Sequence, residues 1–379
     1  MAARFWVGGT GTWNNLNILN WASTTGGVAG ASAPTSADTV TFDANSGTGT
    51  CTTAAGSACS TMTLNTQTVA LVLGANHTAS GGFSFTQGSI DLAGFVLNCN
   101  TVSSSNTNTR SIAFGSTGQI NLLATTGTLW TTSASTGFTT SGSNKVVTAP
   151  NGAAGTRTFN FGAVAETVAM NVSITAGTDT VSLQGRYYTL STTGFTGTIA
   201  ATSRSIYGSL TIGAGATYTS TTTVTSFIGT SGSHTITTNG VTIDGAITFD
   251  GSGGTWTFAD ALTQGAGKNF IFTNGTVKLK NSATSTVGAF STTGTNQKFL
   301  QSSVAGTQAT LSQVSGTVDT SYLTIKDINA IGGATWNSFV DQSNVDAGNN
   351  DGWDFGISPV IGGTEYTYHL RSFTQPRRF

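Results

Sequence analysis

Apolar residues recur along this chain in couplets separated by one residue, with glycine, serine, threonine and asparagine between the couplets. A spacing of two places both side chains on the same face of a short β-strand. The couplets return roughly every 6 to 12 residues, as short strands joined by turns do, and no stretch keeps a helical period. Representative couplets are Val40/Phe42, Met62/Leu64, Phe83/Phe85, Phe95/Leu97/Cys99, Phe159/Phe161, Val168/Met170, Tyr188/Leu190, Ile247/Phe249 and Val277/Leu279. The pattern therefore predicts an all-β protein.

The number and spacing of these strands favour a solenoid. A closed barrel or a sandwich would use fewer and longer strands. A parallel β-helix instead stacks coils of about 20–25 residues, each with two or three short strands, and three couplets per coil give that length. We therefore predict a right-handed parallel β-helix over residues 46–330, with about 12 coils. At about 4.8 Å per coil, it would be a rod about 60 Å long.

The two ends of the chain differ from the middle in amino-acid composition. Residues 1–45 and 331–355 are rich in tryptophan, glycine and asparagine, and both contain the tripeptide Thr-Trp-Asn. The open ends of a solenoid expose sheet edges, so terminal units of atypical sequence are expected to cover them. We predict an N-terminal cap at 1–45 and a C-terminal cap at 331–355. The capping residues would be Trp6, Trp13, Trp21, Trp336 and Trp353.

Charge is scarce in this chain of 379 residues. Charged residues make up 8%, against about 25% in ordinary globular domains, and the formal net charge is −1. Hydroxyl and amide side chains must therefore provide most of the wetted surface. No cluster of lysine and arginine precedes the last residues, which argues against nucleic-acid binding. Low charge suits an exterior protein that must avoid nonspecific electrostatic adhesion.

The cysteines and the N-terminus restrict the cellular setting. Cys99 is in phase with Leu97 and is expected to be a small core residue. Cys51 and Cys59 could pair across a short loop, although we favour two free thiols. The first residues lack an apolar signal-peptide core, and no run approaches the roughly 20 apolar residues of a membrane helix. We expect synthesis in a cytoplasm, no cleaved export signal and no membrane insertion.

Carboxylates are the strongest candidates for catalysis. Cleavage of a glycosidic bond needs two of them about 5–9.5 Å apart. Asp244 and Asp250 could meet around one corner of the solenoid, with Asp260 one rung away. The first two precede glycine, however, and Asp-Gly is typical of a turn. We favour turn roles and predict that the protein is not an enzyme.

The sequence gives only weak support to a metal site. Residues 341–354 contain four aspartates and three asparagines, which could supply oxygen ligands for calcium: Asp341, Asp346, Asp351 and Asp354 are the candidates. The order of an EF-hand loop is absent, so a network of Asx turns is the favoured interpretation. The three histidines, His77, His234 and His369, are far apart in sequence. No cofactor is expected.

The last segment, 356–379, breaks the composition with two prolines and a mixture of basic and aromatic residues. Arginine and aromatic side chains are enriched at protein interfaces. We predict a docking tail that attaches the rod to a partner, and a disordered tail is the alternative. The docking residues would be Tyr366, Tyr368, Arg371, Phe373, Arg377, Arg378 and Phe379.

Both ends carry recognisable motifs. The opening Arg4-Phe-Trp-Val-Gly-Gly-Thr-Gly-Thr-Trp13, together with Asn20-Trp21 and residues 37–47, resembles the openings of β-helical proteins encoded by tailed bacteriophages. The C-terminal motifs are similar to the C-terminal ends of the same class of proteins. They run from Gly333-Ala-Thr-Trp-Asn to Gly348-Asn-Asn-Asp-Gly-Trp-Asp-Phe355. Related Trp-Gly-Gly and Asn-Trp segments occur in bacterial autotransporter adhesins. The resemblance covers the two ends of the chain. Between them, only the general composition and the spacing of apolar residues are alike.

This resemblance implies a structural virion protein: a fibre, a spike or a decoration of the capsid surface. Its expected partners are other virion proteins, itself as a homotrimer, and glycans of the host surface. A β-helix closed within one chain could equally be a monomer. The expected location is the virion surface, after assembly in the host cytoplasm. The resemblance supplies no catalytic residues. A bacterial surface adhesin and a capsule-polysaccharide depolymerase remain alternatives.

Overall fold

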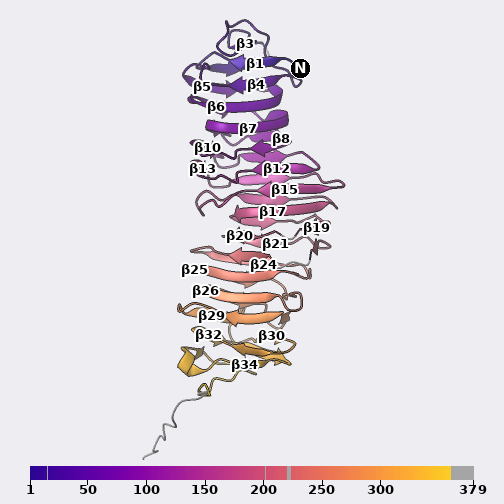
Figure 1. The fold of residues 1–379 in the computed structure, drawn as a ribbon, viewed down its shortest axis with the longest axis vertical. Coiled ribbons are helices and arrows are strands. Elements are labelled where there is room, and N and C mark those ends of the chain that lie inside the picture. Colours follow the sequence, from indigo (N-terminus) through magenta and orange to yellow (C-terminus); the bar gives the residue numbers. More distant parts are fainter. Residues whose placement is uncertain (15, 201, 220–222, 360–379) are drawn as a thin grey trace, which may run out of the picture.

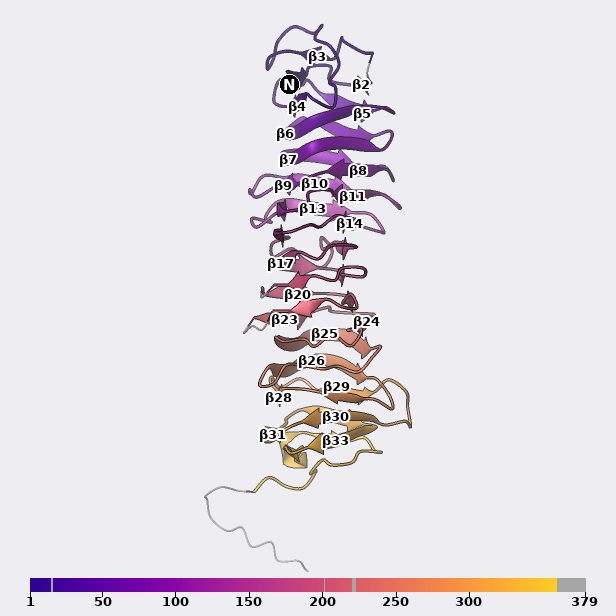
Figure 2. The same cartoon turned by 90° about the vertical axis from the view of Figure 1, so that its right-hand side faces the viewer.

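The computed structural model describes residues 1–14, 16–200, 202–219 and 223–359, and it is a long rod of stacked coils (Figures 1 and 2). The described chain is nearly all β, with about 14 turns, which confirms the predicted β-solenoid. One short 3-10 helix, η1 (Val340–Gln342), lies near the C-terminal end of the rod. The right hand of the coil stays a prediction.

Three strands per coil form three parallel stacks along the rod. The first stack contains β1 (Ala3–Trp6), β4 (Thr39–Phe42), the middle of β6 (Ala58–Leu73) and of β7 (His77–Asp91), β9 (Val102–Ser103), β12 (Gly127–Thr131), β15 (Thr156–Asn160), the first part of β17 (Thr180–Tyr187), β19 (Thr198–Ile199), β22 (Thr217–Tyr218), β27 (Thr284–Thr286), β30 (Ala309–Gln313) and β33 (Ile328–Gly332). Single bridges at Ile243–Gln264 and Thr263–Thr286 continue this stack between β22 and β27.

The second and third stacks run beside the first. The second contains β2 (Gly11–Trp13), β5 (Gly49–Thr53), the ends of β6 and β7, β10 (Arg110–Ala113), β13 (Phe138–Ser141), the end of β17, β20 (Arg204–Ile206), β23 (Val224–Phe227), the starts of β25 (Ala246–Phe258) and β26 (Asn269–Leu279), β28 (Ala289–Thr292), β31 (Thr317–Asp319) and β34 (Thr335–Asn337). The third contains the starts of β6 and β7, β8 (Val96–Cys99), β11 (Gln119–Leu122), β14 (Val146–Ala149), β16 (Asn171–Ile174), β18 (Thr189–Ser191), β21 (Leu210–Thr211), β24 (Ser233–Thr237), the ends of β25 and β26, β29 (Lys298–Ser302), β32 (Leu323–Lys326) and β35 (Val345–Asp346).

The couplets build the core because the parallel register places each one directly on the next. Val40 lies on Met62, Met62 on Phe83 and Phe83 on Val102, and all are buried. Coil length varies more than the couplets suggested. The step to the next coil is 18 residues from Thr180 to Thr198 but 30 from Gly127 to Arg157. Extra residues are accommodated in the bends, where they do not disturb the strand register.

Both segments expected to be caps wind into coils of their own, which explains why the rod has about 14 turns rather than about 12. At the N-terminal end, β1 pairs in parallel with β4, while β3 (Trp21–Ala22) pairs antiparallel with β1 and covers its edge. Trp6, Trp13 and Trp21 are fully buried there. Trp21 packs edge to face on the other two, with ring centroids 5.1 and 5.2 Å away.

At the C-terminal end, single bridges continue the first and second stacks: Asn329 pairs with Asp351, and Asn337 pairs with Asp354. Trp336 is buried and packs on Trp353 with centroids 4.9 Å apart. Both ends of the rod thus have tryptophan pairs over the last core layers. Such edge-to-face pairs contribute about 0.5–1.5 kcal/mol beyond the burial of their area.

Three couplet residues are less buried than expected. Phe95 and Tyr188 are 36% and 37% exposed, and Val168 is half-buried and packs against the edge of the core. Each lies at a bend: the Phe95 amide closes a turn on the Leu92 carbonyl, and Tyr188 separates β17 from β18. Alternation restarts at each bend, so a spacing of two across a bend does not keep both side chains on one face.

Among the described residues, four basic side chains are buried: Arg110, Arg157, Arg204 and Lys298. The scarcity of charged residues in the sequence did not predict this burial. These side chains donate mainly to backbone carbonyls at the bends, where strand pairing stops and acceptors need partners. Arg110, for example, donates to the carbonyls of Ser104 and Thr136 at 2.5 and 2.9 Å. The bends of this solenoid are therefore fixed from inside by charge-assisted hydrogen bonds.

All three cysteines are free and buried, as favoured from the sequence. Burial raises the pKa of the Cys59 thiol to about 12. His77 is also buried, and desolvation lowers the pKa of its imidazole to about 4. Within the described residues, no helix has the length and apolar character to cross a membrane.

Candidate functional site

In the middle of the rod, the second stack lacks one paired strand. Residues 162–170 follow β15 and precede β16, and they form a loop where a strand of the second stack would be expected. As a result, β13 pairs with β10 on one side but with no named strand of the described chain on the other. We call residues 162–170 the bulge loop.

The bulge loop is held along the rod axis by contacts to later coils. The Val164 carbonyl accepts hydrogen bonds from Tyr207 Oη at 2.9 Å and from Arg186 Nη1 at 3.4 Å. Glu166 Oε2 accepts from Thr230 Oγ1 at 2.8 Å, a contact between residues 64 positions apart in sequence. These bonds give the loop a defined position and make it the wall between two pockets.

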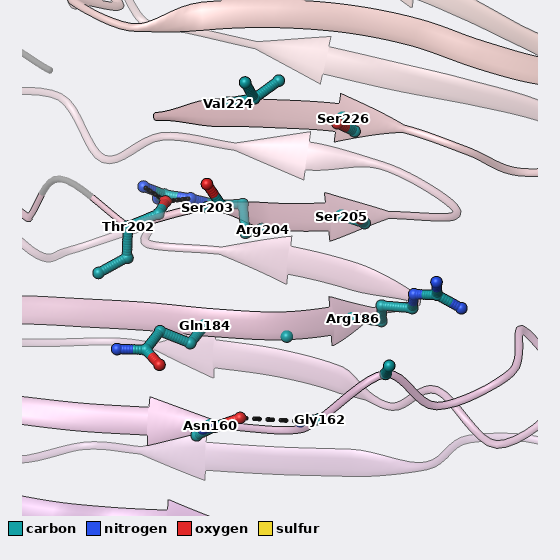
Figure 3. Close-up of a pocket in the computed structure, with 12 residues that line it drawn as sticks. Asn160, Gly162, Gln184, Arg186, Thr202, Ser203, Arg204, Ser205, Val224 and Ser226 are labelled. Carbon is teal, nitrogen blue, oxygen red and sulfur yellow. Dashed lines mark hydrogen bonds between the residues drawn. The ribbon is translucent and has the colours of Figure 1, made fainter. Parts of the chain in front are cut away.

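The first of these, the Arg186 pocket, has a volume of about 510 Å³ and extends over four consecutive coils (Figure 3). Its lining residues are Asn160, Gly162, Ala163, Gln184, Gly185, Arg186, Thr202, Ser203, Arg204, Ser205, Val224 and Ser226. Figure 3 shows Arg186 and Arg204 extending in opposite directions along their strands. Arg204 turns back to the Thr202 carbonyl at 2.9 Å, and Asn160 Oδ1 accepts from the Gly162 amide at 3.0 Å. Most of its lining side chains carry hydroxyl, amide or guanidinium groups, and none is a carboxylate or an aromatic ring.

The second, the Tyr188 pocket, has a volume of about 480 Å³ and lies where the chain turns from the second stack to the third. Its lining residues are Ser143, Lys145, Glu166, Thr167, Asn171, Tyr188, Thr230 and Ser231. The Lys145 ammonium donates to the Thr167 carbonyl at 2.5 Å, and desolvation lowers its pKa. Asn171 Oδ1 accepts from Thr189 Oγ1 at 2.8 Å. This pocket combines an exposed aromatic ring, an amide, hydroxyls and one charge of each sign.

Sequence reasoning missed the residues of the Tyr188 pocket. One signal was present: Glu166 is one of two glutamates in the chain, and the other is Glu365 in the tail. The pairing of Tyr188 with Leu190 as a core couplet concealed its exposure. The pocket depends on long-range contacts between coils, and a single sequence does not show which coils are neighbours.

The proposed catalytic trio is not assembled. Asp244 precedes β25, Asp250 lies at the bend in its middle, and Asp260 follows it. Each carboxylate has a different partner: Lys268 Nζ at 3.6 Å for Asp244, Asn274 Nδ2 at 2.6 Å for Asp250, and the Thr238 amide at 2.9 Å for Asp260. The three residues occupy separate bends of one coil and fasten these bends to neighbouring coils, which corresponds to the turn roles favoured from the sequence.

The four aspartates near the C-terminal end are also dispersed. Asp346 and Asp354 each accept a backbone amide two residues ahead, from Gly348 and Gly356, in Asx turns. Asp351 accepts from the Gln308 amide at 2.8 Å. Asp341 accepts from the backbone amide of Ser358 at 3.0 Å. Over the described residues, no three His, Cys, Asp or Glu side chains converge into a group that could hold a metal ion.

Another pocket, of about 680 Å³, lies at the C-terminal end of the rod and includes Asp319, Asp354 and Pro359. It borders the point where the expected docking tail begins. All seven predicted docking residues, from Tyr366 to Phe379, and His369 lie outside the described residues. Comparison with known protein families, curated proteins and solved structures finds no match to this chain.

Proposed function

We propose that this protein is a structural component of a tailed-bacteriophage particle: a β-solenoid rod, without enzymatic activity, on the surface of the capsid or the tail. The observation that carries the proposal is the rod itself, about 14 stacked coils with few charges on the outside. The tryptophan-rich motifs at both ends, which resemble those of phage β-helical proteins, support the particle as its location.

The physical properties of the rod suit an exposed structural role. Each coil pairs with the next through its backbone, so stability accumulates along the axis without depending on side-chain charge. Of the 11 lysine and arginine residues that the structure describes, four are buried, which leaves the described exterior dominated by hydroxyls and amides. A long, neutral and hydrated surface can project from a particle without adhering to nucleic acid or to other strongly charged surfaces.

Host contact is the second part of the proposal. A rod that projects from a particle places its lateral grooves where a cell surface can reach them. The Arg186 and Tyr188 pockets lie side by side across the bulge loop. Their linings combine hydroxyl and amide groups with apolar surface, and surface glycans present hydroxyls and C–H faces that match both. A trimeric rod and docking through the tail belong to the same proposal by analogy with phage fibres.

Mass spectrometry of gradient-purified particles tests the proposal. The chain should copurify with the particles at a constant ratio to the major capsid protein and should become accessible to externally added antibody. Its presence in the lysate but absence from intact particles would refute the virion role. A reducing-end assay on host capsule is the companion test, because release of reducing ends would favour the depolymerase alternative.

A further inference from the structure

We infer that the Tyr188 pocket is a binding site for an uncharged oligosaccharide, with the Tyr188 ring as its platform. The inference rests on the proposed host-surface role for the source of the glycan, namely the bacterial envelope. The bulge loop and three other coils form the site.

The platform is an aromatic ring presented by rigid backbone. Tyr188 is 37% exposed although its amide donates to the Met170 carbonyl at 2.9 Å and its carbonyl accepts from the Gly208 amide at 2.7 Å. The ring of His234 lies perpendicular to it, with centroids 6.4 Å apart. The C–H face of a sugar ring packs on such a flat apolar surface, and a ring already fixed in place loses little entropy on binding.

Neutral polar groups surround the platform. The Asn171 amide and the hydroxyls of Ser143 and Ser231 line the same pocket. The Asn171 carbonyl oxygen is oriented by Thr189 Oγ1, which fixes the direction of the amide group. Sugar hydroxyls both donate and accept hydrogen bonds, and amide and hydroxyl side chains can match them in either role.

The two charged groups of the pocket are already engaged with its walls. Lys145 donates to the Thr167 carbonyl at 2.5 Å, and Glu166 accepts from Thr230 at 2.8 Å. Both bonds fasten the bulge loop, and the opposite signs leave no net charge to attract an acidic or a basic ligand. An uncharged glycan therefore fits the pocket better than a uronic-acid polymer.

Size and comparison with the adjacent pocket support this assignment. The volume of about 480 Å³ falls in the range of about 300–1,000 Å³ typical of small-ligand sites, and it accommodates a short oligosaccharide. The Arg186 pocket has a similar volume but no aromatic lining residue. Of these two adjacent pockets, the Tyr188 pocket therefore combines a stacking surface with neutral hydrogen-bonding groups, whereas the Arg186 pocket does not.

Titration of the purified full-length chain with maltotriose, N,N′,N″-triacetylchitotriose and trigalacturonate, monitored by saturation-transfer NMR and calorimetry, tests the inference. At least one of the two neutral trisaccharides should bind. Tyr188→Ala should weaken that binding by at least about tenfold, whereas Tyr188→Phe should retain it. The matched control is Phe299→Ala, because Phe299 is 44% exposed in β29 and lies outside the pocket.

The inference is overturned if neither neutral trisaccharide binds, if trigalacturonate binds more tightly, or if Tyr188→Ala binds as the unmodified chain does. Unchanged melting temperatures of the variants show that the fold is intact. Failure of this test leaves copurification with particles unaffected. Absence from particles leaves trisaccharide binding unaffected, so the two proposals fail separately.

Discussion

The buried pair Arg157–Asp179 provides a sharp test of how the bends are held. Asp179 Oδ2 accepts from Arg157 Nε at 2.7 Å, and Oδ1 accepts from Nη2 at 2.9 Å. Both side chains have no exposed surface. The same guanidinium donates to the Ala176 carbonyl at 2.8 Å, so it connects two successive coils. Asp179→Ala removes the counter-charge and leaves the guanidinium buried.

Removing one partner of a buried, hydrogen-bonded ion pair costs about 3–5 kcal/mol, because the remaining charge is desolvated without compensation. In a solenoid each coil contacts only its neighbours, so the loss of stability should be concentrated around β15 and β17. Local opening should then become at least about a hundredfold more frequent, since 1.4 kcal/mol corresponds to a factor of ten. Hydrogen exchange followed by mass spectrometry measures this change peptide by peptide.

Two variants serve as controls for this prediction. Replacing both partners by apolar residues, Arg157→Met with Asp179→Leu, should restore most of the protection because no buried charge remains. Asp319→Ala removes an exposed carboxylate that accepts from Asn337 and should change stability by less than about 0.5 kcal/mol. The reasoning would be refuted if Asp179→Ala reduced hydrogen-exchange protection around β15 and β17 by less than tenfold. It would also be refuted if the double variant lost as much protection as Asp179→Ala.

Three further predictions concern other parts of the chain. Because burial lowers the pKa of His77 to about 4 against 6.5 for an exposed imidazole, its neutral form stabilises the fold fully above pH 6.5. This contribution falls between pH 6.5 and 4, and a His77→Gln variant should lose that part of the pH dependence in urea titrations. Gly88→Ala should destabilise the rod by at least about 1–3 kcal/mol in thermal melts, because φ is +111° and the added Cβ would lie 2.1 Å from the Thr66 carbonyl oxygen; an unchanged melting temperature would contradict this. Deletion of residues 360–379 should abolish incorporation into particles without changing the fold, and undiminished incorporation would disprove the docking tail.

The strand layout was largely predictable because the couplets report side-chain direction, which depends on local alternation alone. Val40, Met62 and Phe83 lie in register in the core as their spacing suggests. The prediction failed at Phe95, Tyr188 and Val168, where a bend resets the alternation. Coil length was also predicted too narrowly, since a bend accommodates extra residues that leave the couplets unchanged.

The candidate site was not predictable for a different reason. The Tyr188 pocket joins residues from four coils, and the contact from Glu166 to Thr230 spans 64 positions. Sequence spacing indicates neighbours within a strand but not the number of residues in each bend, so it cannot assign partners across coils. The converse also holds, because residues close in sequence need not meet in space. The carboxylates of Asp244, Asp250 and Asp260 lie at separate bends and have different partners.

The central claim is that this rod stands on the surface of a phage particle. Cryo-electron microscopy of the native particle tests it most directly, since a solenoid of about 14 turns has a recognisable shape and a repeat of about 4.8 Å per coil. The account predicts elongated, three-sided density on the capsid lattice or the tail that fits the rod from β1 to β35. Particles with every surface density assigned to other chains would contradict it.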